Sequence, residues 1–581
     1  MMSDDEILNK IEECSVNAMR CQHNTLSSIL ERNGGVRYLQ PYLQRYRKPI
    51  DAETFRRSVP ITSYDDYSDH IQRLADGVDD AHDASLLSVD PLRCFFYSSG
   101  TTSMKPKLIP YFDSAASKAA SSLAHQASTV ILRRLFPPRD RINKIMWFLY
   151  GGDVKVTKGG YKAMAASTFP FHNNTANPLL SICVSPREVI LGSNVEQQMY
   201  CHLICGLRNF DVVYGIRAPY AAGLIRAFSL LESKWKQLCH DLEHGFLSFD
   251  VPDVAMRDAV VEILGGPQLG LSVRIRSICG QQDWGGIVGK LWPEVRYIRC
   301  VTTGTMRQYY EKLKYYAGDI PVLGGDYFSS ECAVGINLDS MQPPELTQYV
   351  LLPTAAYFEF LPYGWNEASS DKEQIVDISG VRVGKMYELV VTTHRGLFRY
   401  RLGDVVRVVG FYNSSPKVEF VMRAPKTPNE IITEKDLMSA IESFQVELKN
   451  AAAAEVMEYA SYLDMNVSPK QVKIFLELAE GCLFLKNEKL HDSVLDFKRC
   501  CSLVEDKLGI LYKSQRERGE VGPLLVSVVM SGTFDKIVDV AIQNGAPPNQ
   551  YKPPKIIRNR EIADFMESSK LVTVCLNSLN G

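Results

Sequence analysis

The residues best suited to chemistry in this sequence are the hydroxyl, glycine and lysine side chains of residues 94–111, which read CFFYSSGTTSMKPKLIPY. Ser, Thr and Gly in a turn let several backbone N–H groups and hydroxyls face one anion, and a lysine adds compact positive charge. The segment therefore predicts a loop that binds a polyphosphate, and the alternative is a solvated turn between two strands. It is not a Walker loop, because that motif opens a helix with Gly-Lys-Ser/Thr, and here Pro106 follows Lys105.

Two later segments place acidic side chains beside strands. Residues 320–323 form a short apolar strand that opens into Gly-Gly-Asp-Tyr-Phe-Ser-Ser-Glu, ending at Glu331. Residues 398–407, FRYRLGDVVR, predict two strands joined at a Gly-Asp corner, where Asp404 is placed to bind both hydroxyls of a ribose. The alternative is a hairpin turn in which Asp404 bonds its own backbone.

Length and composition limit the class of protein. With 581 residues the chain is too long for one hydrophobic core, so we expect at least two domains. A hydrophobic content of 45% and a charged content of 23% are ordinary for a globular protein. The formal charge of −2 indicates no nucleic-acid or membrane partner, and no apolar run reaches the length of a membrane span. Because the acidic first residues are unlike a secretory signal, we expect a cytoplasmic protein.

Two motifs that contain candidate metal ligands are better explained as parts of helices or of the core. The segment at residues 201–205, CHLIC, lacks the second pair of ligands that a closed zinc site needs. His240 and His244 have the order His-x-x-Glu-His, but no third ligand is evident and Gly245 ends the helix. We expect a polar helix end there, because histidines are favourable near the negative end of the helix dipole.

The order of the predicted elements indicates two domains. Apolar strands alternate with helices in the first half of the chain, which predicts an α/β fold with a largely parallel sheet. Two prolines mark a linker at residues 425–429. Thr433 and Asp436 then form a capping pair at the start of a helix. We expect a large N-terminal domain, residues 1–424, with mixed β-sheets and flanking helices, and a smaller α+β domain, residues 430–581.

The phosphate loop, a Tyr-x-Ser-Ser-Glu turn, the Gly-Asp corner, the linker and a late lysine follow the order found in adenylate-forming ligases. Five segments resemble more closely the auxin-responsive Gretchen Hagen family of plant acyl acid amido synthetases: SSGTTSMKPKLIPY, DYFSSECAVGINL, AAYFEFLPY, FRYRLGDVVRVVGF and NQYKPPK. This resemblance covers essentially the whole chain. It implies an adenylate-forming N-terminal domain, a mobile C-terminal domain and a monomer that binds neither nucleic acid nor membrane.

The resemblance also implies roles for individual residues. Three are catalytic: Lys107, Glu331 and Lys552. The nucleotide would be contacted by Ser98, Ser99, Gly100, Thr101, Asp326, Tyr327, Phe328, Ser329, Ser330, Asp404, Arg423 and Lys552. Among these, Asp404 would bind the ribose, and Glu331 would help to hold Mg²⁺. The family often has two glycines where this chain has Ser103 and Met104.

The implied enzyme is a ligase that forms carbon–nitrogen bonds from ATP, a small carboxylic acid and an amino acid. The phosphate loop is similar to the jasmonate-conjugating branch, whereas residues 329–338 are similar to the auxin and benzoate branches. We therefore expect a jasmonate-related acid, with indole-3-acetic acid as the alternative. Two other classes share the nucleotide site: an acyl-CoA ligase or acyl-adenylate hydrolase, and a nucleotide-binding regulator without turnover.

Overall fold

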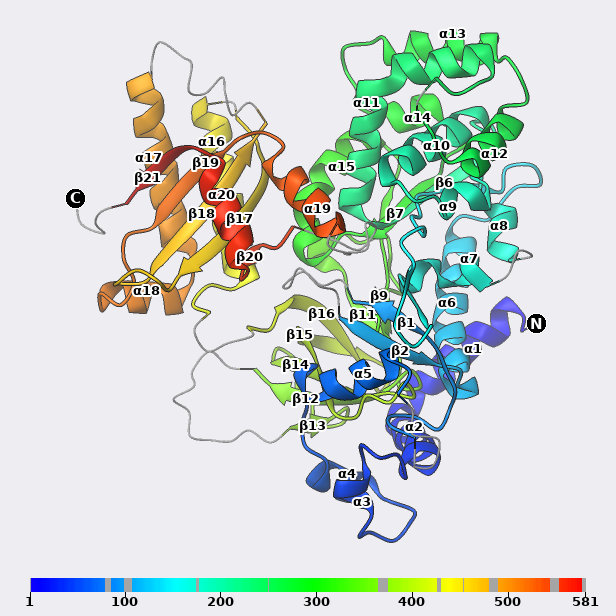
Figure 1. Ribbon diagram of the computed structural model, residues 1–581, viewed down its shortest axis with the longest axis vertical. Coiled ribbons are helices and arrows are strands. Elements are labelled where there is room, and N and C mark those ends of the chain that lie inside the picture. The colour runs from blue at the N-terminus through cyan, green and yellow to red at the C-terminus, as the bar shows by residue number, and fades with distance from the viewer. Residues whose placement is uncertain are drawn as a thin grey trace. The chain divides into compact units, whose positions relative to one another are not determined.

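The computed structural model of this protein describes residues 2–78, 85–98, 107–173, 177–248, 250–363, 375–425, 430–452, 454–479, 490–543 and 553–576. The chain forms two compact units (Figure 1). The large unit contains Met1–Ser98 and Leu108–Phe420, and the small unit contains Ser99–Lys107 and Val421–Gly581. The mixture of sheets and helices confirms the predicted fold class. Most of the predicted linker lies outside the described residues, so its role as a hinge stays a prediction.

One sheet of the large unit is parallel, as the alternation of strands and helices predicted. Its four strands have the order β3-β6-β7-β8. They are β3 (Lys144–Trp147), β6 (Val213–Tyr220), β7 (Tyr297–Val301) and β8 (Val322–Gly324). Helices that share a hydrophobic core with this sheet include α10 (Val195–Arg208), α11 (Ala221–His244), α12 (Val254–Leu264), α13 (Leu269–Cys279), α14 (Ile287–Leu291) and α15 (Tyr310–Ala317). In Figure 1 these helices gather around β6 and β7.

The large unit has two further sheets. The eight-stranded sheet has the order β13-β12-β14-β15-β16-β11-β10-β9. Its strands are β9 (Tyr327–Phe328), β10 (Ala333–Ile336), β11 (Tyr349–Leu351), β12 (Tyr357–Pro362), β13 (Val376–Asp377), β14 (Met386–Thr392), β15 (Tyr400–Tyr412) and β16 (Ser415–Arg423). The four-stranded sheet has the order β2-β1-β5-β4, with β1 (Leu92–Tyr97), β2 (Leu108–Phe112), β4 (Lys155–Val156) and β5 (Lys162–Met164). Apolar side chains of both sheets contribute to one large core.

Helices also cover these sheets. The first helices of the chain are α1 (Asp4–Val16) and α2 (Ala18–Asn33), and α1 packs with the long α6 (Ala115–Leu135). Ser3 caps α1 and makes reciprocal hydrogen bonds with Glu6. The shorter helices are α3 (Gln40–Leu43), α4 (Ala52–Ser58), α5 (Ser68–Ala75), α7 (Phe169–Asn173), α8 (Pro178–Ile182) and α9 (Arg187–Ile190).

The predicted corner between two strands at Gly403 and Asp404 is wrong. Strand β15 runs without interruption through both residues. Glu388 on β14 pairs with Val405, and Val390 pairs with Arg401, so β15 has extra residues between these pairs and forms a bulge. Gly403 has φ +78°, a conformation that glycine adopts without strain. A Gly-Asp pair therefore bends the strand here instead of ending it.

The two candidate metal motifs are parts of helices. Helix α11 ends at His244, and Gly245 follows with φ +71°, which confirms the predicted polar helix end. His202 lies in α10 and is fully buried. Its Nδ1 is 2.7 Å from Ser185 Oγ, and its Nε2 is 2.9 Å from the carbonyl oxygen of Leu149. Both ring nitrogens are thus engaged by protein groups.

Burial of His202 makes stability depend on pH. Burial lowers the pKa of the imidazole to about 4, whereas a histidine in an unfolded chain has a pKa of about 6.5. Because the unfolded chain then binds a proton that the folded chain does not, the free energy of unfolding should fall by up to about 3 kcal/mol as pH falls from about 6.5 to about 4. Urea unfolding of the wild type and of His202→Gln at several pH values in this range measures this. The variant should lose less stability with acid, and equal losses would contradict the prediction.

The small unit contains a five-stranded sheet of order β20-β17-β18-β19-β21. Its strands are β17 (Val456–Asp464), β18 (Gln471–Leu478), β19 (Leu525–Val529), β20 (Ile556–Ile557) and β21 (Lys570–Cys575). Its helices are α16 (Glu434–Ala452), α17 (Leu490–Lys507), α18 (Ile510–Glu517), α19 (Thr533–Gln543) and α20 (Arg560–Ser568). The predicted cap of α16 is confirmed, since the Asp436 N–H donates to Thr433 Oγ1 over 3.1 Å and Thr433 Oγ1 donates to the Asp436 carboxylate over 2.6 Å.

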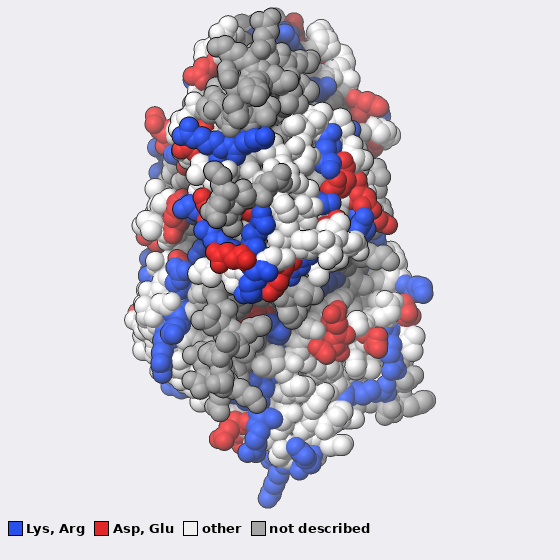
Figure 2. All heavy atoms as spheres, turned by 90° about the vertical axis from the view of Figure 1, so that its left-hand side faces the viewer, with Lys and Arg blue, Asp and Glu red and all other residues white. Residues whose placement is uncertain are grey.

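Charges are mixed on the surface. On the face drawn in Figure 2, lysine and arginine side chains alternate with aspartate and glutamate, as a formal charge of −2 leads one to expect. Among the described residues, every helix is either too short or too polar to cross a lipid bilayer.

Candidate active site

The Ser-Ser-Glu motif forms the tip of a tight hairpin between β9 and β10. The Ser329 N–H donates to the carbonyl oxygen of Cys332 over 3.0 Å, and the Cys332 N–H donates to Ser329 Oγ over 3.1 Å. These two bonds leave Ser330 and Glu331 at the tip. The Glu331 side chain is buried, with 7% of the residue exposed. The hairpin therefore holds a carboxylate in a fixed position inside the large unit.

A hydrogen bond joins this tip to the start of the predicted phosphate loop. Ser330 Oγ donates to the carbonyl oxygen of Tyr97 over 2.8 Å. Tyr97 is the last residue of β1, and Ser98 follows it directly. Two motifs that are 233 residues apart in the chain thus meet. The rest of the predicted loop, Ser99 to Thr101, lies outside the described residues.

A second contact brings Tyr327 and Asp404 together. The Tyr327 hydroxyl donates to Asp404 Oδ2 over 2.6 Å, and both residues are buried. Tyr327 belongs to β9, and Asp404 lies in the bulge of β15. The strand that leads to Glu331 therefore also contacts the predicted ribose ligand.

Asp326 is held by protein groups on both carboxylate oxygens. Its Oδ2 accepts from Ser128 Oγ on α6 over 2.5 Å and from Arg299 Nη2 on β7 over 2.6 Å. Its Oδ1 accepts from the Asn337 N–H over 3.1 Å. These bonds fix the strand that precedes the hairpin. On the strand β9 that follows, Phe328 is 36% exposed, whereas Tyr327 is 9% exposed.

The other predicted site residues have the following places. Lys107 immediately precedes β2, and Arg423 is the last residue of β16. Lys552 lies outside the described residues. The structure thus brings the hairpin tip to the end of β1, where Ser330 contacts Tyr97. It also brings β9 to the bulge of β15, where Tyr327 contacts Asp404.

One residue at this site, Arg395, was not predicted from the sequence, and it lies between β14 and β15. Its Nη1 donates to the carbonyl oxygen of Ser330 over 2.7 Å, so it contacts the hairpin tip directly. The guanidinium carbon lies 5.5 Å from the ring centre of Phe96 and 5.0 Å from that of Tyr111. Burial lowers the pKa of Arg395. The signal in the sequence is a pair of basic residues, His394 and Arg395, between two apolar strands.

Glu331 fits the donor set of a nucleotide-bound Mg²⁺. Such an ion is usually held by one or two carboxylates together with phosphate oxygens and water. In the part of the chain that the structure describes, no three His, Cys, Asp or Glu side chains gather around one point. A single carboxylate at a hairpin tip is therefore compatible with an ion that arrives with ATP, and not with a cage made by the protein alone.

The sequence matches all three domains by which one protein family is described. The GH3 family N-terminal domain matches residues 7–322, its central domain residues 349–423 and its C-terminal domain residues 435–561. A probable indole-3-acetic acid-amido synthetase from Oryza sativa subsp. japonica is 50% identical over 65% of this chain and 79% of that protein. An indole-3-acetic acid-amido synthetase from Arabidopsis thaliana is 34% identical over 98% of this chain and 94% of that one. A jasmonoyl-L-amino acid synthetase from Nicotiana attenuata is 34% identical over 98% and 96%.

Solved structures agree with these matches. The GH3.15 acyl acid amido synthetase has a TM-score of 0.87 with 27% identity, and the match covers 100% of this chain and 99% of that one. The fold and the site therefore define a ligase of the acyl acid amido synthetase class. More particularly, the chain belongs to the GH3 family, which confirms the resemblance found in the sequence.

Proposed function

We propose that this protein uses ATP to convert a carboxylic acid to an acyl-adenylate, and then transfers the acyl group to the amine of an amino acid. The observation that carries the proposal is the convergence of the Ser-Ser-Glu hairpin with the end of β1. A carboxylate oxygen attacks the α-phosphorus and pyrophosphate leaves. The neutral amine then attacks the acyl carbonyl, AMP leaves, and an amide is formed. The enzyme works in the cytoplasm as a monomer.

Each residue type suits its proposed role. Ser98, with Ser99, Gly100, Thr101 and Lys107, would bind the phosphates and offset their charge as the second anion approaches. Glu331 would hold Mg²⁺, which supplies further positive charge to the phosphates when it is bound. The remaining contacts to the nucleotide are assigned to Asp326, Tyr327, Phe328, Ser329, Ser330, Asp404, Arg423 and Lys552.

The proposed acid is a jasmonate-related acid, and indole-3-acetic acid is the second candidate. Residues 98–111 resemble the jasmonate-conjugating branch, and one relative named above is a jasmonoyl-L-amino acid synthetase. Two of the relatives named above are an indole-3-acetic acid-amido synthetase and a probable one, which supports the second candidate.

Exchange of labelled pyrophosphate into ATP, dependent on an added acid, tests the first half-reaction. We expect exchange with jasmonate or indole-3-acetate and an amide product when amino acids are added. A thioester formed from CoA would instead indicate an acyl-CoA ligase. Absence of exchange with a broad panel of plant acids would favour a regulator without turnover and contradict the proposal.

Asp404→Asn should weaken nucleotide binding. The carboxylate that accepts the Tyr327 hydroxyl is also the proposed ribose ligand, and hydrogen bonds to a charged group contribute more than neutral ones. We expect the KM for ATP to rise about 10- to 100-fold, with a smaller change in the KM for the acid. Tyr327→Phe separates the two contacts of Asp404, because it removes the hydroxyl and keeps the carboxylate, and it should raise the KM for ATP less than Asp404→Asn does. A normal KM for ATP in Asp404→Asn would contradict the assignment.

A further inference from the structure

Arg395 is a buried cation whose nearest protein partners are uncharged. Only 8% of the residue is exposed. Its hydrogen bonds go to the carbonyl oxygen of Ser330 and, at 3.4 Å each, to the hydroxyls of Ser117 and Ser121 on α6. Within the described parts of the chain, no carboxylate forms an ion pair with its guanidinium, although the nearby Glu331 carboxylate attracts it electrostatically. This differs from the buried Arg399, whose guanidinium pairs with Glu359 over 2.8 Å.

The buried position of Arg395 carries an unfavourable desolvation free energy for its positive charge. An ion removed from water needs an opposite charge or strong hydrogen bonds to offset its desolvation. Two bonds of 3.4 Å are at the weak end of the range for hydrogen bonds. The rings of Phe96 and Tyr111 add cation–π attraction, which offsets only part of this cost. The guanidinium is therefore better matched to an anion than to its present surroundings.

Arg395 also lines a small cavity. The other side chains at this cavity include Ser117, Ser121, Glu331, Thr393 and His394. The cavity is partly open and has space for about one water molecule between its walls, which suits a polar end group better than a ring or an alkyl chain. Burial lowers the pKa of His394, which favours its neutral form and leaves Arg395 as the permanent cation of the cavity wall.

We propose that Arg395, with the hydroxyls of Ser117 and Ser121, forms a subsite that binds the carboxylate of a substrate. A guanidinium offers parallel N–H groups that match the two oxygens of a carboxylate. The inference rests on the proposed function, in which both the acid and the amino acid carry such a group. Glu331 in the same wall would place that carboxylate beside the proposed metal ligand. The position favours the acid, since its carboxylate must reach the nucleotide.

The test measures binding by calorimetry, without turnover, in the presence and absence of AMP. The probes are jasmonate, indole-3-acetate and benzoate with their neutral amides, and isoleucine and aspartate with isoleucinamide. The variants are Arg395→Gln, which keeps a donor for Ser330, and Arg395→Lys, which keeps the charge. Arg217→Gln is the matched control, because Arg217 also lies over two aromatic rings, those of Trp147 and Tyr297, but away from the cavity.

We expect the wild type to prefer at least one acid over its amide, and Arg395→Gln to bind that acid at least 10-fold more weakly and lose the preference. Arg395→Lys should recover part of the affinity, and Arg217→Gln should bind as the wild type does. If only the amino acid arm responds, the subsite binds the amino acid carboxylate. Unchanged discrimination between acid and amide in Arg395→Gln, or no binding of any carboxylate by the wild type, would overturn the inference. If Arg395→Gln leaves the discrimination unchanged but pyrophosphate exchange still occurs, the inference fails and the proposed function stands. If the wild type binds a carboxylate but shows no exchange, only the proposed function is contradicted.

Discussion

Glu331→Gln should reduce the rate of acid-dependent pyrophosphate exchange about a thousandfold. Glutamine keeps the shape of the side chain and removes its charge, so the hairpin tip should fold as before. The proposed metal ligand would be lost, and with it the charge compensation that the transferring phosphate needs. The measurement is exchange at several Mg²⁺ concentrations, where the variant should need more Mg²⁺ for half-maximal rate.

Glu345→Gln is the control for this experiment. Glu345 lies in the same unit, is 46% exposed and pairs with Arg307 at the surface. We expect exchange within about twofold of the wild type, because exposed ion pairs contribute little. Full activity of Glu331→Gln at ordinary Mg²⁺ concentrations would contradict the proposed role of Glu331.

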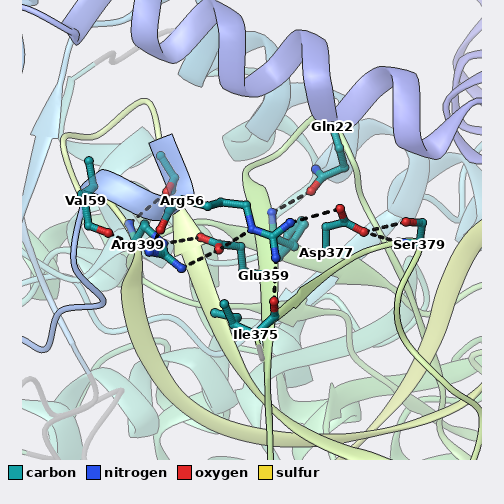
Figure 3. A network of polar contacts seen from close by, with 10 residues as sticks. Gln22, Arg56, Val59, Glu359, Ile375, Asp377, Ser379 and Arg399 are labelled. Atoms are coloured by element: carbon teal, nitrogen blue, oxygen red, sulfur yellow. Dashed lines mark hydrogen bonds and ion pairs between the residues drawn. The ribbon is translucent and has the colours of Figure 1, made fainter. Parts of the chain in front are cut away.

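Glu359→Gln should have the largest effect on stability. Figure 3 shows the Glu359 carboxylate between two arginines. Arg399 Nη2 lies 2.8 Å and Arg56 Nε 3.3 Å from Glu359 Oε1, and the Glu359 side chain is 1% exposed. Removal of its charge leaves Arg399 buried without a carboxylate, which should lower the free energy of unfolding by about 3–5 kcal/mol. Urea unfolding followed by tryptophan fluorescence measures the change.

Glu243→Gln provides the comparison for stability. Glu243 pairs with Arg276 over 2.7 Å, and both side chains are partly exposed, at 32% and 43%. Its loss should change the free energy of unfolding far less than the loss of the Glu359 charge does, because exposed ion pairs contribute little. If Glu359→Gln proves no more harmful than Glu243→Gln, the buried pair does not stabilise the large unit as described.

Local patterns in the sequence were sufficient to predict those features that depend only on neighbouring residues. The capping pair at Thr433 and Asp436 and the end of α11 at Gly245 depend on residues within one turn. The Gly-Asp corner was misjudged because a glycine with positive φ serves a turn and a bulge equally well. The pairing of β15 with β14 decides between the two, and this pairing is not visible in a run of ten residues.

The candidate site was predicted in its motifs but not in its contacts. The resemblance assigned Tyr327, Glu331 and Asp404 to one nucleotide, and the structure places Tyr327 against Asp404. Arg395 escaped notice because its burial comes from Phe96, Tyr111 and Ser330, which belong to distant parts of the chain. A basic residue between two strands ordinarily faces water, so nothing in the local sequence distinguishes Arg395 from a surface residue.

The bond between Ser330 and Tyr97 also bears on how the protein is made. Because the contact closes a long loop of chain, we expect it to form late in folding, together with the intervening sheet and helices. A ribosome that has released the first 300 residues has exposed β1 but not the hairpin that fixes its end. We therefore expect the proposed nucleotide site to form only in the finished large unit, and a nascent or truncated chain to lack it.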